Sequence, residues 1–231
     1  MSTTAVIYSG EARTFAQTFA NQYWWLLRLL PDPEFFISVA DDAQADDMPR
    51  MLRTRFPANR IHFEKVVQPT LPEPPPDPPF LSCPPSVPPQ AILRQLWALN
   101  QAWDFSQSCH DLVVRIRPDI AFTRFEIPNM VEGSCCLTPW WGRWGGVNDR
   151  LAFLRDFAIR PYFTTFFRFK RLMDLGCPLH PETLIDASLR DAAITPSHTL
   201  AAEFITVRLD GTTRPADITM VDVVEYARTR P

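Results

Sequence analysis

Two arginines and an aspartate occupy alternate positions in the stretch LVVRIRPD, residues 112–119. Alternate side chains of a strand share one face, so Arg115, Arg117 and Asp119 form a row leading to the strand's end. Burying a lone arginine is costly, and so these charges need partners. Two guanidinium groups beside one carboxylate could bind a diphosphate, with Asp119 holding a sugar hydroxyl or a metal ion. A buried ion-pair network with acids on neighbouring elements is the alternative, which spacing alone favours.

A second polar group follows the first expected strand in SGEARTF, residues 9–15. Gly10 permits close approach of the backbone to a ligand. Arg13 opens the next helix, where a cation opposes the helix dipole and therefore requires some other partner. An anionic ligand would supply that partner, and a surface salt bridge with Glu11 explains the arginine equally well.

A third group lies in WWGRWGGVNDRLAF, residues 140–153, where three tryptophans and three glycines stand close together. This composition is typical of a flexible loop whose rings, such as Trp144, stack on sugars or bases. Asn148 and Asp149 follow, and Asp149 could act as a general base or bind a hydroxyl. The alternative is a glycine turn with tryptophans that plug the edge of the core.

A fourth candidate is Glu182 in HPET, residues 180–183, at the first turn of an expected helix. An acid at that place is also expected simply because it complements the helix dipole. The four histidines are scattered, at His62, His110, His180 and His198, without the spacing of metal ligands.

Strands that alternate with helices must position these groups. The pattern predicts strands at 5–10, 34–40, 60–67, 112–119, 133–139 and 202–209, and helices at 13–30, 47–56, 91–105, 155–174 and 180–194. This alternation predicts an α/β fold with a largely parallel central sheet flanked by helices. In such sheets, ligands bind at the carboxyl ends of the strands, where the candidate groups fall.

Ten prolines lie between Pro72 and Pro89. Such density excludes helix and central strand. The segment could be a linker, a ligand for a proline-binding domain, or a loop beside the active site. We favour the loop, because strand–helix alternation resumes in the same style after it. We therefore expect one domain over residues 1–231 with a proline-rich excursion at 72–89.

Composition narrows the functional classes. The 231 residues carry 23 Lys+Arg against 26 Asp+Glu, a balance that argues against a general nucleic-acid binder. Five cysteines without a CxxC pair fit a reducing compartment. The first residues do not resemble a signal peptide, and no apolar run reaches the length of a transmembrane segment. We expect a soluble cytoplasmic protein.

Several segments, taken in order, resemble those of one family: AVIYSGEARTF, PEFFISVADD, RQLWALNQAWDF leading into DLVVRIRPDIAF, GGVNDRLAF and HPETLI. They look like bacterial GT-A-type glycosyltransferases, in particular poorly characterised members associated with lipopolysaccharide and capsular polysaccharide synthesis. The resemblance covers about residues 4–195. It implies a single Rossmann-like GT-A-type domain that binds a nucleotide-sugar, with RPD near the place of the family's DxD motif.

The resemblance implies transfer of a sugar from a nucleotide-sugar donor to a hydroxyl of a glycan or lipid-linked acceptor. Gly10 and Arg13 would lie beside the nucleotide, with Trp144 and Asn148 also contacting substrate. A lipid-linked acceptor would be compatible with peripheral membrane association. The alternatives are a non-catalytic binding or scaffold protein of the same fold, or another nucleotide-dependent transferase or hydrolase. The absence of GxxxxGK[ST] argues against a P-loop enzyme.

The resemblance also suggests roles for the charged residues. Arg115, Arg117 and Asp119 would face the diphosphate-sugar, and Asp149 or Glu182 would be the base if the reaction inverts. A DxD motif offers two carboxylates to Mn²⁺ or Mg²⁺, but Arg117 stands where the first would be. The arginine could itself neutralise the diphosphate, leaving Asp119 as the candidate metal ligand. We expect Asp119 and Asp149 to share one cleft, and Arg117 to lack a partner in the free protein.

Overall fold

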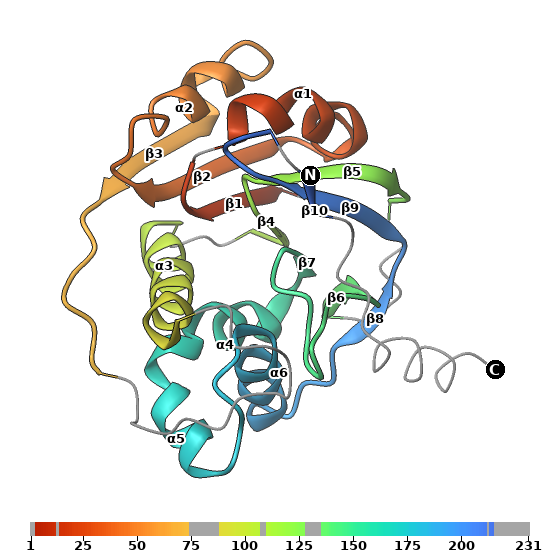
Figure 1. Cartoon of the computed structure of the whole chain (residues 1–231). Helices are drawn as coiled ribbons and strands as arrows, with labels where there is room; N and C mark the ends of the chain where they lie inside the picture. The colour runs from red at the N-terminus through yellow and green to blue at the C-terminus, as the bar shows by residue number, and fades with distance from the viewer. Residues whose placement is uncertain are drawn as a thin grey trace.

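The chain folds into alternating strands and helices around a seven-stranded sheet (Figure 1). The structure, a computed structural model, describes residues 3–12, 14–73, 88–106, 110–127, 135–211 and 213–214. Arg13 and residues 74–87 of the expected proline-rich excursion therefore lie outside the described residues.

The large sheet has the strand order β3-β2-β1-β4-β7-β6-β8. Strands β1, β2, β3 and β4 run parallel to one another, and β6 runs parallel to β8. β7 is antiparallel to both of its neighbours, β4 and β6. These strands span β1 Thr4–Gly10, β2 Pro33–Ala40, β3 Ile61–Val66, β4 Leu112–Ile116, β6 Cys136–Pro139, β7 Leu151–Leu154 and β8 Ser197–Leu200. The predicted α/β class and largely parallel sheet are confirmed.

The strands on either side of the proline-rich segment belong to the same sheet. β3 precedes the segment and pairs with β2, whereas β4 follows it and pairs with β1. A second, antiparallel sheet has the order β10-β9-β5, with β5 at Ile120–Phe125, β9 at Ala202–Val207 and β10 at Thr213–Arg214. β5 follows β4 after only three residues, so the stretch RPD forms the turn between the two sheets.

Helices cover both faces of the large sheet, as Figure 1 shows. One face carries α1 (Phe15–Trp25), α2 (Asp47–Leu52) and the small sheet, and the other carries α3 to α6. The latter helices are α3 Pro89–Ser106, α4 Ile159–Phe163, α5 Phe169–Asp174 and α6 Pro181–Asp191. Short 3₁₀ turns lie at Leu27–Leu29, Ala58–Arg60, Asp156–Ala158 and Thr164–Phe167. Proline begins both α3 and α6, where its missing N–H is not needed.

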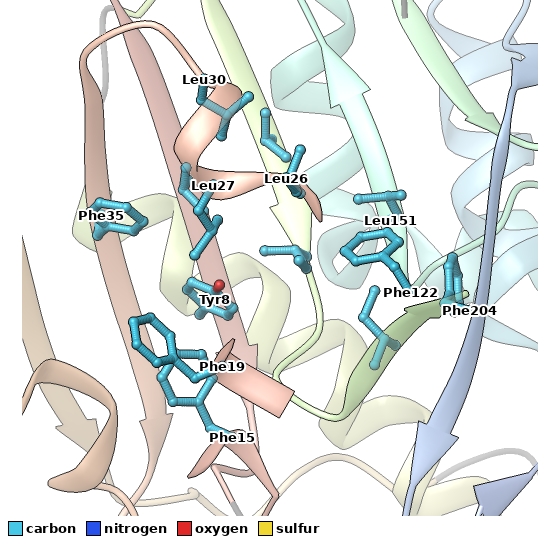
Figure 2. Close-up of a cluster of buried hydrophobic side chains, with 14 of the residues drawn as sticks. Tyr8, Phe15, Phe19, Leu26, Leu27, Leu30, Phe35, Phe122, Leu151 and Phe204 are labelled. Atoms are coloured by element: carbon cyan, nitrogen blue, oxygen red, sulfur yellow. The ribbon is translucent and has the colours of Figure 1, made fainter. Parts of the chain in front are cut away.

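Strict alternation along the strands divides the core between these two faces. In β1, Val6 and Tyr8 join the cluster beneath α1, while Ala5 and Ile7 join the cluster beneath α3. Figure 2 shows the first cluster, with Tyr8 among aromatic and leucine side chains from α1 and the turn after it. In β4, Val114 faces the first cluster. Arg115 therefore lies on the side covered by α3 to α6.

The expected helix at 155–174 is wrong as a single element. The chain forms four short pieces there, two α-helical and two 3₁₀. Pro161 lies within the stretch and cannot donate a backbone hydrogen bond. The hydroxyl of Thr164 donates to the carbonyl of Arg160 at 2.8 Å, a competing bond that tends to bend helices. The helix expected at 13–30 likewise ends at Trp25, and the strands β5, β7, β8 and β10 were not predicted.

Buried Gln22 of α1 holds the turn that follows β4. Its Nε2 donates to the carbonyl oxygens of Arg117, Pro118 and Ile120 at 3.1, 3.2 and 2.9 Å. The Thr18 hydroxyl donates to the Pro118 carbonyl at 2.5 Å. Because proline ends the strand's ladder, these carbonyls lack strand partners, and α1 satisfies them instead. The helix thereby fixes the turn that carries Arg117.

Replacing Gln22 by leucine should loosen this turn. We expect Gln22→Leu to lower the free energy of unfolding by about 1–3 kcal/mol, because buried carbonyls lose their donor. Gln17→Leu on the exposed side of the same helix is the matched control and should change stability by no more than about 0.5 kcal/mol. Chemical denaturation measures both, and equal losses in the two variants would contradict this role of Gln22.

Candidate functional site

A cavity of about 730 Å³ opens at the carboxyl ends of the parallel strands. Its wall includes Gly10 of β1, Ala40 of β2 and Val66 of β3, each the last or nearly the last residue of its strand. The first half of α3 and residues 207–210, at the end of β9 and after it, contribute the remaining sides. Small-molecule sites typically enclose roughly 300–1,000 Å³, and open α/β sheets place them at this edge.

Arg115 is a buried, incompletely paired arginine on the wall of this cavity. Its side chain extends from β4 and is only 2% exposed. Its Nε and Nη1 are enclosed by protein, and neither has a hydrogen-bond partner among the described residues. Burial lowers the pKa of Arg115, an effect that the nearby Tyr162 of α4 partly opposes. The Tyr162 hydroxyl is also buried, and it has no hydrogen-bond partner within the part of the chain that the structure describes.

Arg117 and Asp119 form a two-point ion pair across the turn. Arg117 Nε lies 2.9 Å from Asp119 Oδ1, and Nη2 lies 2.5 Å from Oδ2. Burial tends to raise the pKa of Asp119, but Arg117 outweighs it and holds that pKa below its usual value. Burial likewise tends to lower the pKa of Arg117, and Asp119 reverses that shift. The expectation that Arg117 lacks a partner in the free protein is wrong, and the ion-pair alternative holds for this residue.

Antiparallel pairing of β4 with β7 brings Asp149 to the same arginine. Arg115 pairs with Ala152, so the residues just before β7 lie beside those just after β4. Asp149 Oδ2 is 3.7 Å from Arg117 Nη1 and also accepts a hydrogen bond from Gln95 Nε2 of α3. Burial tends to raise the pKa of Asp149, but surrounding arginines, Arg117 first, hold it below its usual value. Asp119 and Asp149 thus contact one guanidinium.

Glu182, at the start of α6, lies behind Asp149. It is 3% exposed, and burial together with the Asp149 charge raises the pKa of Glu182 to about 7. A hydrogen bond joins the two carboxyl groups. On its other side, Glu182 Oε2 lies 2.6 Å from His180 Nδ1. Burial tends to lower the pKa of His180, and Glu182 outweighs it and raises that pKa. Proton affinity is therefore raised at Glu182 and His180, while Asp149 is held ionised.

The glycine-rich loop is packed directly against the start of α6. Val147 N–H donates to the Glu182 carbonyl at 3.1 Å. A Cβ atom on Gly146 would lie 2.1 Å from that same oxygen, so only glycine fits there. Asn148 is fully buried, and its amide donates to the Trp141 carbonyl at 2.9 Å while its oxygen accepts from Arg150 N–H. Asn148 therefore closes this loop.

The tryptophans of the loop do not face the cavity. Trp141 is 1% exposed, and its Nε1 donates to the Ala202 carbonyl at 2.7 Å. Trp144 is half-buried, with its ring centroid 5.7 Å from that of His180. The alternative interpretation, in which tryptophan plugs the edge of the core, is confirmed for Trp141.

The structure thus separates the sequence-predicted residues into two groups. Gly10, Arg115, Arg117 and Asp119 line the cavity. Behind its described wall lie Trp144, Asn148, Asp149 and Glu182. Asp149 is linked to the wall through Gln95 and Arg117, whereas Arg13 lies outside the described residues.

Sequence reasoning missed the part of the wall that α3 forms. Arg94, Gln95 and Trp97 line the cavity, and Arg208 lies opposite in the segment after β9. The hydrophobic pattern predicts Trp97 in the apolar stripe of the helix, but its ring is only half-buried. Arg94 could have indicated this wall, because it lies one turn before Trp97 and next to the buried leucines of α3. A polar residue at that place marks the boundary of the core.

The donor set at Asp119 does not fit a divalent cation. Both carboxylate oxygens accept hydrogen bonds from Arg117. Among the described residues, no three His, Cys, Asp or Glu side chains gather as metal ligands. Divalent cations favour several oxygen ligands at once, which this arrangement does not provide.

In comparisons with known proteins, no family model matches the chain, and no curated protein matches it in sequence. Over the described residues, no helix is both long and apolar enough to cross a membrane.

Alanine substitutions at Gly145 and Gly146 should show whether lack of space or backbone strain costs more stability in this loop. We expect Gly146→Ala to destabilise the protein more, because its Cβ would overlap the Glu182 backbone. Gly145→Ala meets nothing closer than 3.9 Å but keeps a φ of +79°. That conformation costs about 1–2 kcal/mol for a residue with a side chain. Thermal unfolding compares them, and a smaller loss in Gly146→Ala would contradict the close approach.

Glu182 should make the protein less stable as pH rises. Its pKa moves from the ordinary 4.5 to about 7 on folding, so the folded state binds more protons between these values. Stability then falls across this pH window, by about 3 kcal/mol in total. Glu182→Gln should remove that loss, and it should also remove the raised pKa of His180, because Glu182 is the group that raises it. Denaturation curves at several pH values test this, and identical slopes for both proteins would refute it.

Proposed function

We propose that the protein is a glycosyltransferase that moves a sugar from a nucleotide-sugar donor to a hydroxyl of a glycan or lipid-linked acceptor. The observation that carries the proposal is Arg115, whose side chain is 2% exposed and lines a 730 Å³ cavity, while its enclosed Nε and Nη1 have no hydrogen-bond partner among the described residues. Buried charges are normally paired, and a phosphate group in the cavity would compensate the charge of this guanidinium.

The arrangement of the strands supports a GT-A-type fold as part of this proposal. Four parallel strands end at one edge beside Gly10, whose φ of +105° suits a tight approach of backbone to ligand. The small antiparallel sheet lies next to this edge and supplies residues 207–210 to the cavity. Nucleotides bind at the corresponding place in other open α/β sheets.

In the proposed reaction, catalysis depends on positioning and charge stabilisation. Arg115 and Arg117 would stabilise the leaving diphosphate. Asp119, ionised and on the wall, would accept hydrogen bonds from the donor sugar. The half-buried Trp97 offers a ring on which a base or sugar can stack.

Geometry assigns Asp149 and Glu182 to support of the cavity wall within this proposal. A pKa of about 7 would suit Glu182 to proton transfer, but a general base must first reach the reacting hydroxyl. Glu182 contacts the wall through Asp149, which orients Gln95 and Arg117. Asp149 is the closer of the two to the cavity and is our candidate base if the transfer inverts.

A second candidate is a nucleotide-sugar-binding protein without transferase activity. The positions of the carboxylates favour this candidate, because a transferase that inverts needs a base at the acceptor hydroxyl. Asp119 is neutralised by Arg117, and neither Asp149 nor Glu182 lines the described cavity. Such a protein would bind the donor with similar affinity but would not consume it.

The test combines binding and turnover. The full chain would be screened by thermal shift against nucleoside diphosphates and nucleotide-sugars, and each binder would then be incubated with glycan acceptors. We expect at least one donor to raise the melting temperature and to release nucleoside diphosphate when an acceptor is present. Arg115→Met should lose both effects, whereas Arg53→Met, an exposed arginine on the opposite face, should keep them. Binding without release would favour the second candidate, and no binding would refute the proposal.

A further inference from the structure

Arginine supplies the positive charge available to a ligand in this cavity. Arg94 of α3 and Arg208 beyond β9 are exposed at the wall, and within the described residues neither has a hydrogen-bond or ion-pair partner for its side chain. Arg115 adds a third guanidinium, at depth, with Nε and Nη1 unpaired. These three arginines come from separate elements and converge on one cavity, an arrangement suited to a ligand with more than one negative charge.

Among these arginines, Arg115 carries the buried charge that such a ligand would stabilise most. A guanidinium keeps its proton even when buried, so it cannot relieve desolvation by becoming neutral. The charge of Asp149 opposes the shift that burial imposes on the pKa of Arg115, but that pKa remains lowered. A phosphate placed against this guanidinium from the cavity would compensate its charge, and arginine binds phosphate through charge-assisted hydrogen bonds.

Asp119, in contrast, is not free to bind a cation. Arg117 neutralises it through both oxygens, and Asp149 lies 3.7 Å from the same guanidinium on its other side. A metal ion at Asp119 would have to displace Arg117, the cation that Asp119 and Asp149 already share. The displaced guanidinium would then be left in a largely buried place without its carboxylate partners, which is costly.

From these contacts we propose that the site binds the diphosphate of its donor through Arg115 together with Arg94 and Arg208, and works without a divalent cation. The inference rests on the proposed glycosyltransferase function and specifies how the leaving group is stabilised. The bond between the anomeric carbon and the diphosphate oxygen breaks, and its electron pair stays on that oxygen beside the arginines. The acceptor oxygen forms the new bond to the carbon, and its proton passes to a base or to water.

Calorimetric titration of the full chain with UDP and GDP, in EDTA and again in Mn²⁺, tests the inference. We expect the better ligand to bind with the same dissociation constant in both buffers. Arg115→Met should weaken its binding roughly 10- to 100-fold in EDTA, the value of a lost charge-assisted contact to the ligand. Arg115→Lys, which keeps charge but loses the fork, should fall between, and Arg53→Met should bind as wild type.

Stability distinguishes this role of Arg115 from a structural one. Because Nε and Nη1 are unpaired, Arg115→Met without ligand should melt at the wild-type temperature or above it. A large drop in melting temperature with unchanged nucleotide affinity would overturn the inference. Binding that requires Mn²⁺ and disappears in EDTA would also overturn it, while leaving the proposed function standing. Absence of nucleotide binding in both buffers would overturn the proposed function itself.

Discussion

The guanidinium of Arg117 is shared by two carboxylates that the chain brings from different directions. Asp119 approaches through the turn after β4, and Asp149 approaches through the antiparallel start of β7. Because each carboxylate depends on the same cation, a shift of either element would leave a negative charge poorly compensated in a largely buried place. The ion pair thus couples the turn between the two sheets to the loop before β7.

Hydrogen bonds and packing of uncharged groups hold the two segments that bring Arg117 and its carboxylates together. Gln22 and Thr18 of α1 bind the carbonyls of the turn, and Gly146 lets the glycine-rich loop lie against the backbone of Glu182. The first contact comes from one face of the sheet and the second from the other. The charged residues at the strand ends are therefore held by buried backbone contacts on both faces, while the cavity between α3 and residues 207–210 stays open to a ligand.

The sequence allowed prediction of features that depend on local periodicity. Alternation in LVVRIRPD correctly placed Arg115 with Val113 on one face and Val114 with Ile116 on the other. Four-residue strands carry too little pattern: LAFL reads as continuous apolar sequence, and SHTL in β8 is mostly polar. Strand order and register are set by contacts between distant segments, which periodicity does not encode.

The same distinction explains which parts of the candidate site could be anticipated. Gly10, Arg115 and Asp119 stand out because glycine or charge interrupts an apolar strand pattern where strands end. Arg94 and Trp97 lie on a helix in which exposed arginine and partly buried tryptophan are ordinary, so Arg94 marks the edge of the apolar stripe but does not indicate a cavity. That Arg117 is paired with Asp119 depends on the direction of the turn, and this direction is held by Gln22, nearly one hundred residues earlier.

The wall of the cavity joins segments from nearly opposite ends of the described chain. Ser9 and Gly10 lie on one side, and residues 207–210 enter only after β9 has paired with β5, some eighty residues away in sequence. Pairings of such long range close late in folding, since the entropy of loop closure must be overcome first. The cavity should therefore be the last feature to form as the chain folds. A ligand that fits it would favour the completed molecule over any partly folded one and protect the chain from opening at β9.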